Sequence, residues 1–286
     1  MPSARAVALG AYASVVGDEA SVFVNPAGMA PIRTMAFGVS HDEDFLGARL
    51  TSAAVVRRFG RFNFGLGAMF LDLGGDSVIV PDPAFGGERG MFGGSLIEAY
   101  HALGVAAAAY RRGMLSVGAS VKGLREVVDD GSSDPYRLTA VTGDLGLALA
   151  VFDITSLALA VQNVAGGVSA SGTGVAPAPL PRTVRFGWTI NLVDPQGLQR
   201  LLLTTDWVRP TGGDQYWALG LEAGAMKSGM GIFARGGLAL GRAPSDRRPY
   251  SWGAGIRVLG LWLDYSVESF RSAPRPLRRF SLRWVP

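Results

Sequence analysis

Few residues of this chain have the types and spacing that catalysis needs. There are two histidines, His41 and His101, and no cysteine. Neither histidine belongs to a Ser-His-Asp set or a His-Glu-x-x-His zinc motif, and no Gly-Lys-Ser/Thr phosphate loop or three-glycine dinucleotide fingerprint occurs. The sequence therefore predicts a protein that is not an enzyme, has no catalytic residue and binds no cofactor.

One short acidic stretch could hold a hard cation. His41-Asp42-Glu43-Asp44 combines carboxylates with an imidazole, and both groups ligate metals. A stretch of this kind beside an apolar segment is more often a hydrated loop tip whose charges face water. We therefore predict no metal site.

The composition indicates a membrane protein without spanning helices. The chain has 286 residues, 40 of them glycine, with 17% charged residues and a mean hydropathy of +0.24. Soluble domains carry about 25% charged residues and about 7% glycine. No window approaches the ~18 consecutive apolar residues of a membrane helix. Hydrophobic excess without a long apolar run is typical of a bacterial outer-membrane β-barrel.

The pattern of side chains supports this class. In Phe62–Phe70, the phenylalanines, Leu66 and Ala68 alternate with Asn63, two glycines and Met69, as expected for a strand with one apolar face. Reading the whole chain in this way predicts an all-β barrel of about fourteen antiparallel strands. The expected strands are Arg33–Ser40, Leu46–Val56, Arg61–Leu71, Glu98–Tyr110, Met114–Val127, Tyr136–Val151, Ile154–Val164, Arg182–Leu192, Leu198–Val208, Gln215–Ala223, Gly229–Leu238, Pro249–Val258, Leu261–Ser269 and Leu277–Val285.

The predicted connections fall into two classes. Every second connection is a short turn, and these lie near Gly60, Arg112, Phe152, Pro195, Lys227 and Gly260. The others are mostly longer, and Asp72–Ile97 and Ala165–Pro181 are the longest. Outer-membrane barrels have short periplasmic turns and longer outer loops. We therefore expect both termini in the periplasm.

Charged residues recur within the predicted strands. An Arg or Lys that faces lipid at mid-depth costs roughly 2–4 kcal/mol, so these charges are expected to face a polar lumen. There they could pair with opposite charges on neighbouring strands, and a role in holding the structure in register is favoured over a substrate role. The residues expected in the lumen are Arg49, Lys122, Asp144, Arg185, Asp206, Glu222, Arg235, Arg257 and Asp264.

The first 32 residues differ from the rest, so we divide the chain into residues 1–32, a hatch or plug, and residues 33–286, the barrel. Ala4–Pro31 has helical spacings of alanine and leucine, with Asp18 as a helix N-cap. A barrel wider than about eight strands needs water or a plug inside. The motif Asn25, Pro26, Ala27 and Gly28 is either a simple turn before the first strand or the anchor of the plug on the inner wall.

Met1-Pro2-Ser3 does not begin a signal peptide. We therefore expect that an export signal was removed or lies upstream of residue 1.

The segment Ala4–Tyr12, Asp18 and the run Asn25-Pro26-Ala27-Gly28-Met29-Ala30 resemble the N-terminal hatch of the FadL/TodX outer-membrane superfamily, and look closest to its PorV/PorQ branch. The likeness covers essentially the whole chain. The strand segments that share it are Leu115–Gly123, Asp144–Leu147, Leu159–Val164 and Leu261–Tyr265. Two features depart from the superfamily: the expected outer loops are short, and the chain ends Trp284-Val285-Pro286 instead of on an aromatic residue.

The resemblance implies a fourteen-stranded barrel with an N-terminal plug. On the FadL side it implies a channel for hydrophobic small molecules that leave sideways into the membrane. On the PorV/PorQ side it implies a non-enzymatic component of a type IX secretion assembly, and a purely structural barrel subunit is a third reading.

The partners expected are outer-membrane lipids and lipopolysaccharide, together with either a hydrophobic small molecule or a secretion-system protein. The net charge of +4 without a basic run argues against nucleic acid.

Overall fold

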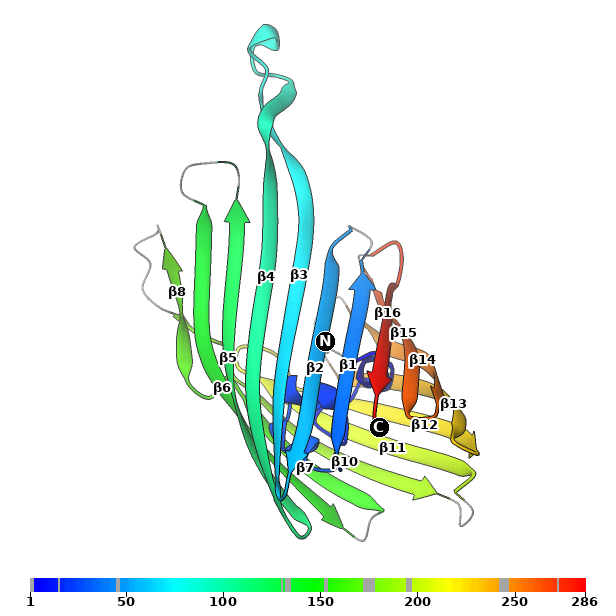
Figure 1. Cartoon of the computed structure of the whole chain (residues 1–286). Helices are drawn as coiled ribbons and strands as arrows, with labels where there is room; N and C mark the ends of the chain where they lie inside the picture. Colours follow the sequence, from blue (N-terminus) through cyan, green and yellow to red (C-terminus); the bar gives the residue numbers. More distant parts are fainter. Residues whose placement is uncertain are drawn as a thin grey trace.

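The computed structural model describes residues 3–14, 16–44, 47–129, 131, 135–151, 154–171, 178–193, 197–241, 247–271 and 273–286. Its main body is a closed antiparallel β-barrel (Figure 1). Fourteen strands of the described chain form the ring, which confirms the predicted strand number and fold class. They are β1 (Met35–Glu43), β2 (Arg49–Phe59), β3 (Phe62–Pro81), β4 (Gly90–Arg112), β5 (Leu115–Asp129), β6 (Tyr136–Val151), β7 (Thr155–Gln162), β10 (Thr183–Val193), β11 (Gln199–Pro210), β12 (Tyr216–Lys227), β13 (Met230–Gly241), β14 (Arg247–Val258), β15 (Leu261–Phe270) and β16 (Leu277–Trp284).

Two-residue turns join several of these strands at one end of the barrel. In Ser228-Gly229 and Leu259-Gly260 both residues have positive φ, as in the type I′ turns that match the twist of a hairpin. The start of β1 and the end of β16 meet at the same end, where Phe37 pairs with Trp284. We call this the short-turn end. The turns expected near Phe152 and Pro195 involve residues outside the described part of the chain.

Side chains alternate between the two faces of the wall, as the sequence pattern predicts. The outward face carries exposed apolar residues in every region of the barrel. Between β3 and β4, Phe62 packs against Tyr110 at the short-turn end, with ring centroids 5.0 Å apart. Phe70 packs against Tyr100 further along, at 5.5 Å. Aromatic pairs at both edges of an apolar band are typical of membrane–water interfaces.

The region predicted as the loop Asp72–Ile97 is mostly strand, so this prediction is wrong. β3 and β4 continue past the rest of the wall as a long hairpin, which ends in the single turn η3 (Pro83–Phe85) and projects from the barrel (Figure 1). Its glycines indicated a loop, but Ser77–Val80 is rich in β-branched residues, which favour strands. Register shifts after Asp72 and Ser77 absorb the irregular residues.

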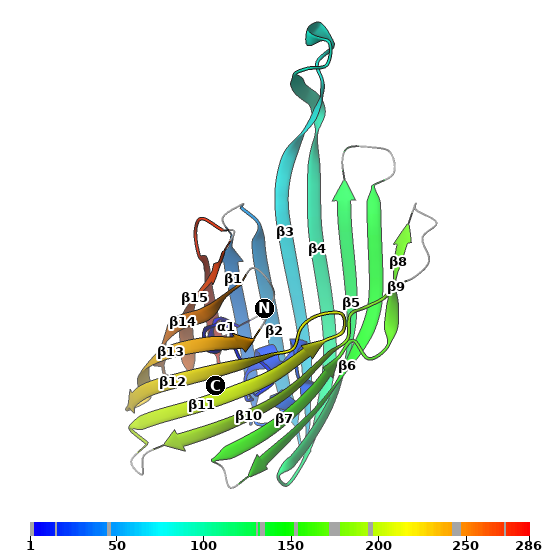
Figure 2. The same cartoon turned by 180° about the vertical axis from the view of Figure 1, so that it is seen from behind.

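The loop predicted at Ala165–Pro181 also contains strand. β8 (Gly166–Ser171) pairs with the first half of β6, and the two-residue β9 (Ala178–Pro179) pairs with β8. β7 pairs only with the second half of β6, from Leu145 to Val151. The wall is therefore interrupted where β6 exchanges β7 for β8, and Figure 2 shows β8 rising beside β6 while β10 to β13 run at a shallow angle.

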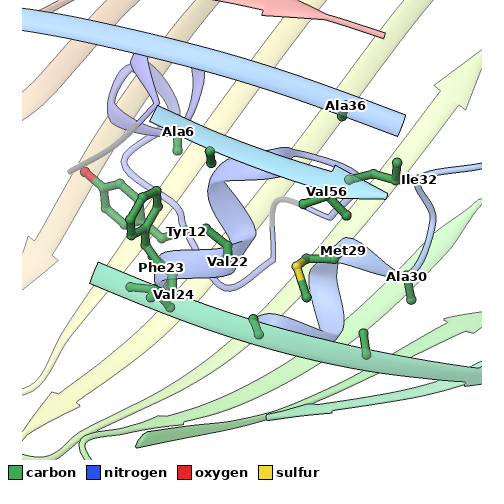
Figure 3. Packing of buried hydrophobic residues seen from close by; sticks show 14 of the residues in the cluster. Ala6, Tyr12, Val22, Phe23, Val24, Met29, Ala30, Ile32, Ala36 and Val56 are labelled. Atoms are coloured by element: carbon green, nitrogen blue, oxygen red, sulfur yellow. The ribbon is translucent and has the colours of Figure 1, made fainter. Parts of the chain in front are cut away.

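Residues 3–14 and 16–32 lie inside the barrel, as the dark blue segment of Figures 1 and 2 shows. They form three short helices, α1 (Ala4–Leu9), η1 (Glu19–Phe23) and η2 (Pro26–Met29), whose residues are all buried. Val22, Phe23 and Met29 form an apolar cluster with Ala36 and Val56 of the wall (Figure 3). None of the helices in the described residues is long and apolar enough to cross a membrane.

Candidate functional site

The N-terminal segment (residues 3–32) is joined to the inner wall first by a charged network around α1. Arg5 donates from Nε and Nη2 to the carboxylate of Glu222 on β12, at 2.8 and 3.2 Å. Arg235 on β13 donates to the same carboxylate at 2.6 Å and to Asp264 on β15 at 2.5 Å. Arg200 on β11 lies 3.7 Å from Glu222. Burial alone would lower the pKa of Arg5, but Glu222 outweighs it and the net shift is upward, so Arg5 stays charged.

The loop after α1 is held by one carboxylate of the wall. Asp206 on β11 accepts hydrogen bonds from the backbone amides of Tyr12, Ala13 and Ser14, at 2.7, 2.7 and 3.0 Å. The hydroxyl of Ser14 is also hydrogen-bonded to that of Thr204. Three successive amides that point at one anion form a compact anion nest. In this nest the anion comes from the barrel and the amides come from the segment.

The Asn25–Gly28 motif lies against β5 and β6. The amide oxygen of Asn25 accepts from the backbone N–H of Ala27 at 3.2 Å and so caps η2, while its Nδ2 donates to the carbonyl of Ala13 at 3.2 Å. Two wall glycines make room for this contact. A Cβ at Gly118 would lie 2.5 Å from the nitrogen of Ala27, and a Cβ at Gly146 would overlap the side chain of Asn25. Glycine in a strand allows such a close approach of another backbone.

A polar cluster links η1 to the interruption of the wall. Lys122 on β5 donates to the carbonyl of Phe23 at 3.0 Å and forms an ion pair with Asp144 on β6. Asp144 accepts from the backbone amide of Asn163, just beyond the end of β7, at 3.0 Å. Gln162, the last residue of β7, also donates to the carbonyl of Phe23, at 3.4 Å. The same few side chains therefore contact both the segment and the point where β7 leaves β6.

The chain turns sharply at this interruption. Asn163 has a φ of 57°, and Gly166, with a φ of 98°, begins β8 so close to β6 that a Cβ would overlap the carbonyl oxygen of Val141. Thr142 donates to the carbonyl of Ala165 at 2.6 Å. A residue other than glycine at 166 would therefore displace β8 from β6.

Glu19 is the second charged group of the segment that faces the wall. It is buried, and its Oε2 lies 4.0 Å from Nε of Arg283 on β16 without a hydrogen bond in the described structure. Nη1 of Arg283 lies 3.8 Å from Asp18. Burial first, and the neighbouring Asp18 second, raise the pKa of Glu19 to about 8. Arg283 opposes this shift but does not cancel it.

Most of the charges expected in the lumen are indeed buried at inward-facing positions. Lys122, Asp144, Asp206 and Glu222 contact the segment or one another as described above. The remaining buried residues are Arg185, Arg235 and Asp264. Arg185 donates to Gln162 at 3.0 Å, and its guanidinium lies 5.5 Å from the ring of Tyr12. Arg257 is half-buried, with its guanidinium 5.2 Å from the ring of Trp262.

The prediction for Arg49 is wrong. Its side chain is 59% exposed and lies 3.9 Å from Glu43 on the outer face. Arg49 is the first residue of β2 and lies at the end of the barrel opposite the short turns. At this end of the strand an outward-facing charge reaches water instead of lipid. In the acidic stretch, Asp42 is buried and pairs with Arg279 at 2.6 Å, whereas His41 contacts Thr51 on the outer face at 2.9 Å. A pattern with alternating faces therefore separates residues that are adjacent in sequence.

Several residues that position the segment were missed by sequence reasoning. Asn63 donates to the carbonyls of Met29 and Ile32 at 3.1 and 2.9 Å, and Ser251 donates to that of Ala8 at 3.1 Å. Arg5 could have been noticed, because it is the single charge in an Ala- and Leu-rich helix that enters a lumen with carboxylates. Asn63 carried no signal beyond being a polar residue at an inward position.

Residues 3–171 match the model of UPF0164, described as an uncharacterised protein family. No curated protein matches the chain. Among solved structures, the CymD monoaromatic hydrocarbon channel superposes with a TM-score of 0.66 at 12% identity, over 100% of this chain and 97% of CymD. The Ralstonia pickettii toluene transporter TbuX superposes with a TM-score of 0.61 at 14% identity, over 98% of this chain and 96% of TbuX. A Pseudomonas aeruginosa FadL homologue superposes with a TM-score of 0.60 at 12% identity, over 100% of this chain and 98% of the homologue. At these identities the likeness establishes a shared FadL-like barrel fold.

Proposed function

The chain belongs to the UPF0164 family, and we propose that it is an outer-membrane channel through which small hydrophobic molecules pass. CymD, TbuX and the FadL homologue share its fold, and the first two are a hydrocarbon channel and a toluene transporter. The exposed apolar outer wall with aromatic residues at both edges supports a place in the membrane. The short-turn end, where β1 begins and β16 ends, would face the periplasm, as short turns do in outer-membrane barrels.

One observation supports this proposal: the N-terminal segment lies in the lumen beside an interrupted wall. The N-terminal segment is bonded to Glu222 on β12 and packs its backbone against Gly118 on β5. A solute that enters from the end of the long hairpin therefore meets a plug. Among the described strands, β8 and β9 are not paired with β10, so the wall next to the plug is the place where a solute can leave sideways.

The chemistry of this route favours apolar molecules. A sideways exit delivers the solute into the hydrocarbon region of the membrane, which a hydrated solute would enter only at a cost of several kcal/mol per unpaired polar group. The carbonyl of Phe23 is held by Lys122 and Gln162 directly at the interruption. A small displacement of η1 would therefore free the polar cluster and open the route.

Locking the segment to the wall tests this proposal. Ser14 and Thr204 are in hydrogen-bond contact, and the chain has no cysteine, so S14C with T204C provides one defined disulfide. Uptake of oleate and toluene would be measured in cells that lack their own fatty-acid channel. We expect the double variant to take up both compounds only after reduction, whereas each single variant behaves like the wild-type protein and none takes up glucose. Equal uptake by the oxidised and reduced double variant, or no uptake above empty cells by the wild-type protein, would refute the channel.

A second candidate function is favoured by the long hairpin. Its exposed side chains include Ile79, Phe85 and Phe92, which no other described part of the barrel covers. A two-stranded hairpin of this length is marginally stable alone, so a docked protein would stabilise it. This would suit a PorV/PorQ-like component of a secretion assembly. If residues 76–96 were replaced by a two-residue turn, unchanged oleate uptake together with loss of a co-purifying protein would support this alternative over the channel.

A further inference from the structure

A groove on the outer wall has no role in the proposed transport. It crosses β2 to β6 and has a volume of about 650 Å³, within the ~300–1,000 Å³ range of small-molecule sites. Its lining residues lie in three rows that the strand pairing aligns. The middle row is Ser52, Met69, Leu103, Leu124 and Ala140, whose side chains face inward, so the groove runs between two rows of outward-facing residues. The row nearer the long hairpin is Thr51, Phe70, Ala102, Arg125 and Thr139; the other row is Ala53, Ala68, Gly104, Gly123 and Val141.

Small residues make the floor of this groove. A Cβ at Gly104 or Gly123 would meet no atom within 4 Å. Larger outward side chains border this floor: Val141, at the β6 end of the groove, is 64% exposed, and Leu66, next to the groove on β3, is 62% exposed. The outer wall is therefore locally hollow between larger apolar side chains, and this shape fits a flexible hydrocarbon chain.

Arg125 lies at one edge of the groove. It is level with Phe70, one of the aromatic residues that indicate the membrane–water interface, and it is the only charged residue of the two rows. In the described part of the chain no hydrogen bond or ion pair satisfies its guanidinium, since Glu126 faces inward and lies 3.5 Å from His101. Arg137 lies on the same outward face of β6 but opposite Val127, two residues further along, and is not among the residues that line the groove. An arginine at this depth is placed to meet a phosphate of the lipid headgroups.

We propose that this groove binds one anionic phospholipid, with an acyl chain over Gly104 and Gly123 and the phosphate on Arg125. The apolar floor and the single cationic edge match the two parts of such a lipid. A groove with one guanidinium among its lining residues suits a single phosphodiester better than a glycolipid with many chains and several phosphates. The site lies outside the lumen, so it does not depend on the channel function.

A second groove provides a matched control. It lies on the outer wall across β10 to β13, has a volume of about 820 Å³, and is also floored by small residues, among them Ala223 and Ala234. Its one charged residue, Arg200, pairs with Glu222 in the interior. This groove offers a similar apolar surface without an outward cation, so it should not distinguish anionic from neutral lipids.

The test is native mass spectrometry of the full chain released from nanodiscs of phosphatidylcholine with a minority of phosphatidylglycerol. We expect one phosphatidylglycerol to be retained in preference to phosphatidylcholine. In R125Q the preference should fall about tenfold, as loss of one charge-assisted hydrogen bond predicts. G123L, which fills the groove, should retain neither lipid, whereas A234L in the control groove should behave like the wild-type protein. Wild-type retention by R125Q, or an equal loss in A234L, would overturn the site.

Discussion

Glu222 faces the interior from β12 and is shared by the guanidinium groups of Arg5, Arg200 and Arg235. Two of these belong to the wall and one belongs to the N-terminal segment. A buried carboxylate with this many cationic neighbours stabilises the structure chiefly because each partner would otherwise be a buried, unpaired charge. Arg5 could not be buried inside the barrel without this carboxylate, so the network is required for the segment to lie there.

Substituting E222Q should therefore destabilise the barrel strongly. It leaves three arginines without their shared anion, and breaking a buried charge network of this kind lowers the free energy of unfolding by about 3–5 kcal/mol. R49Q removes an exposed pair and should change it by at most about 1 kcal/mol. Urea unfolding in detergent micelles, followed by the electrophoretic shift of the folded barrel, measures both. If E222Q and R49Q unfolded at the same urea concentration, Glu222 would not be the shared anion of a buried charge network.

A second prediction concerns the contact between the Asn25–Gly28 motif and the wall. G118A would place a methyl group against the backbone of Ala27, so the segment must shift at a cost of about 1–3 kcal/mol. G104A faces open space on the outer wall and is the matched control. A cysteine introduced at the buried Ser21 should react faster with a thiol reagent in G118A than in G104A. The same rate in both would show that the motif does not depend on this glycine.

Residue positions were predictable wherever one physical argument decided them. The cost of charge in lipid placed Glu222, Arg235 and Asp264 in the interior, and it failed for Arg49 because that residue lies at the end of its strand. The partners were not predictable. Asp206 binds three backbone amides far away in sequence, and no side-chain pattern marks those amides as donors.

At the scale of elements, the N-terminal segment has helices that cannot be stable alone. α1 has six residues, η1 has five and η2 has four, all well below the ~12–15 residues at which an isolated helix becomes marginally stable. Ser3, Asp18 and Asn25 cap their first turns. Of these caps, the one at Asp18 was predicted from the sequence, whereas Asn25 was interpreted as part of a turn or an anchor. The docking that stabilises these helices depends on the wall.

Docking of this segment should depend on pH through Glu19. Its pKa is raised to about 8 in the folded protein, so the docked state favours the protonated carboxyl. Protonated Glu19 therefore stabilises the docked segment. This stabilisation is fully present below the ordinary pKa of about 4.3 for Glu and is lost as the pH rises through 8. A cysteine that replaces Ser21 should therefore react faster with a thiol reagent as the pH rises from 5 to 9. The rate is divided by that of the same cysteine in E19Q, because this ratio removes the reagent's own dependence on pH. A constant ratio across this range would contradict the shift.

The strands themselves were readable from the two-residue period, and each of the fourteen predicted strands corresponds to one in the ring. The long hairpin and β8 were not readable, because glycine and proline in Asp72–Ile97 and Ala165–Pro181 indicated loops. Pairing with a neighbouring strand overrides such local preferences. Both β7 and β8 pair with β6, and the arrangement of the whole sheet decides where each of them pairs. The sequence of a single segment does not indicate this arrangement.

At the scale of the whole molecule, the segment and the barrel should be separable. Deletion of residues 1–30 should leave an assembled barrel, because the strand pairing does not involve them. The emptied lumen would fill with water, as in wide barrels, and the carboxylate of Asp206 would become hydrated. We expect vesicles containing the shortened chain to leak small sugars that the full chain retains. Leakage equal to that of the full chain would show that the segment does not seal the lumen.

The position of this segment directly before β1 has a consequence for how the protein is made. The ring closes through seven residue pairs between β1 and β16, the contact with the longest separation along the chain. Contacts of this kind carry the largest loop-closure entropy and form late in folding. In the full chain we therefore expect the segment to be inside before the first and last strands meet, because its bonds to β11, β12 and β5 connect both halves of the chain. The segment would then speed the closure of the ring, although the strands can also pair without it.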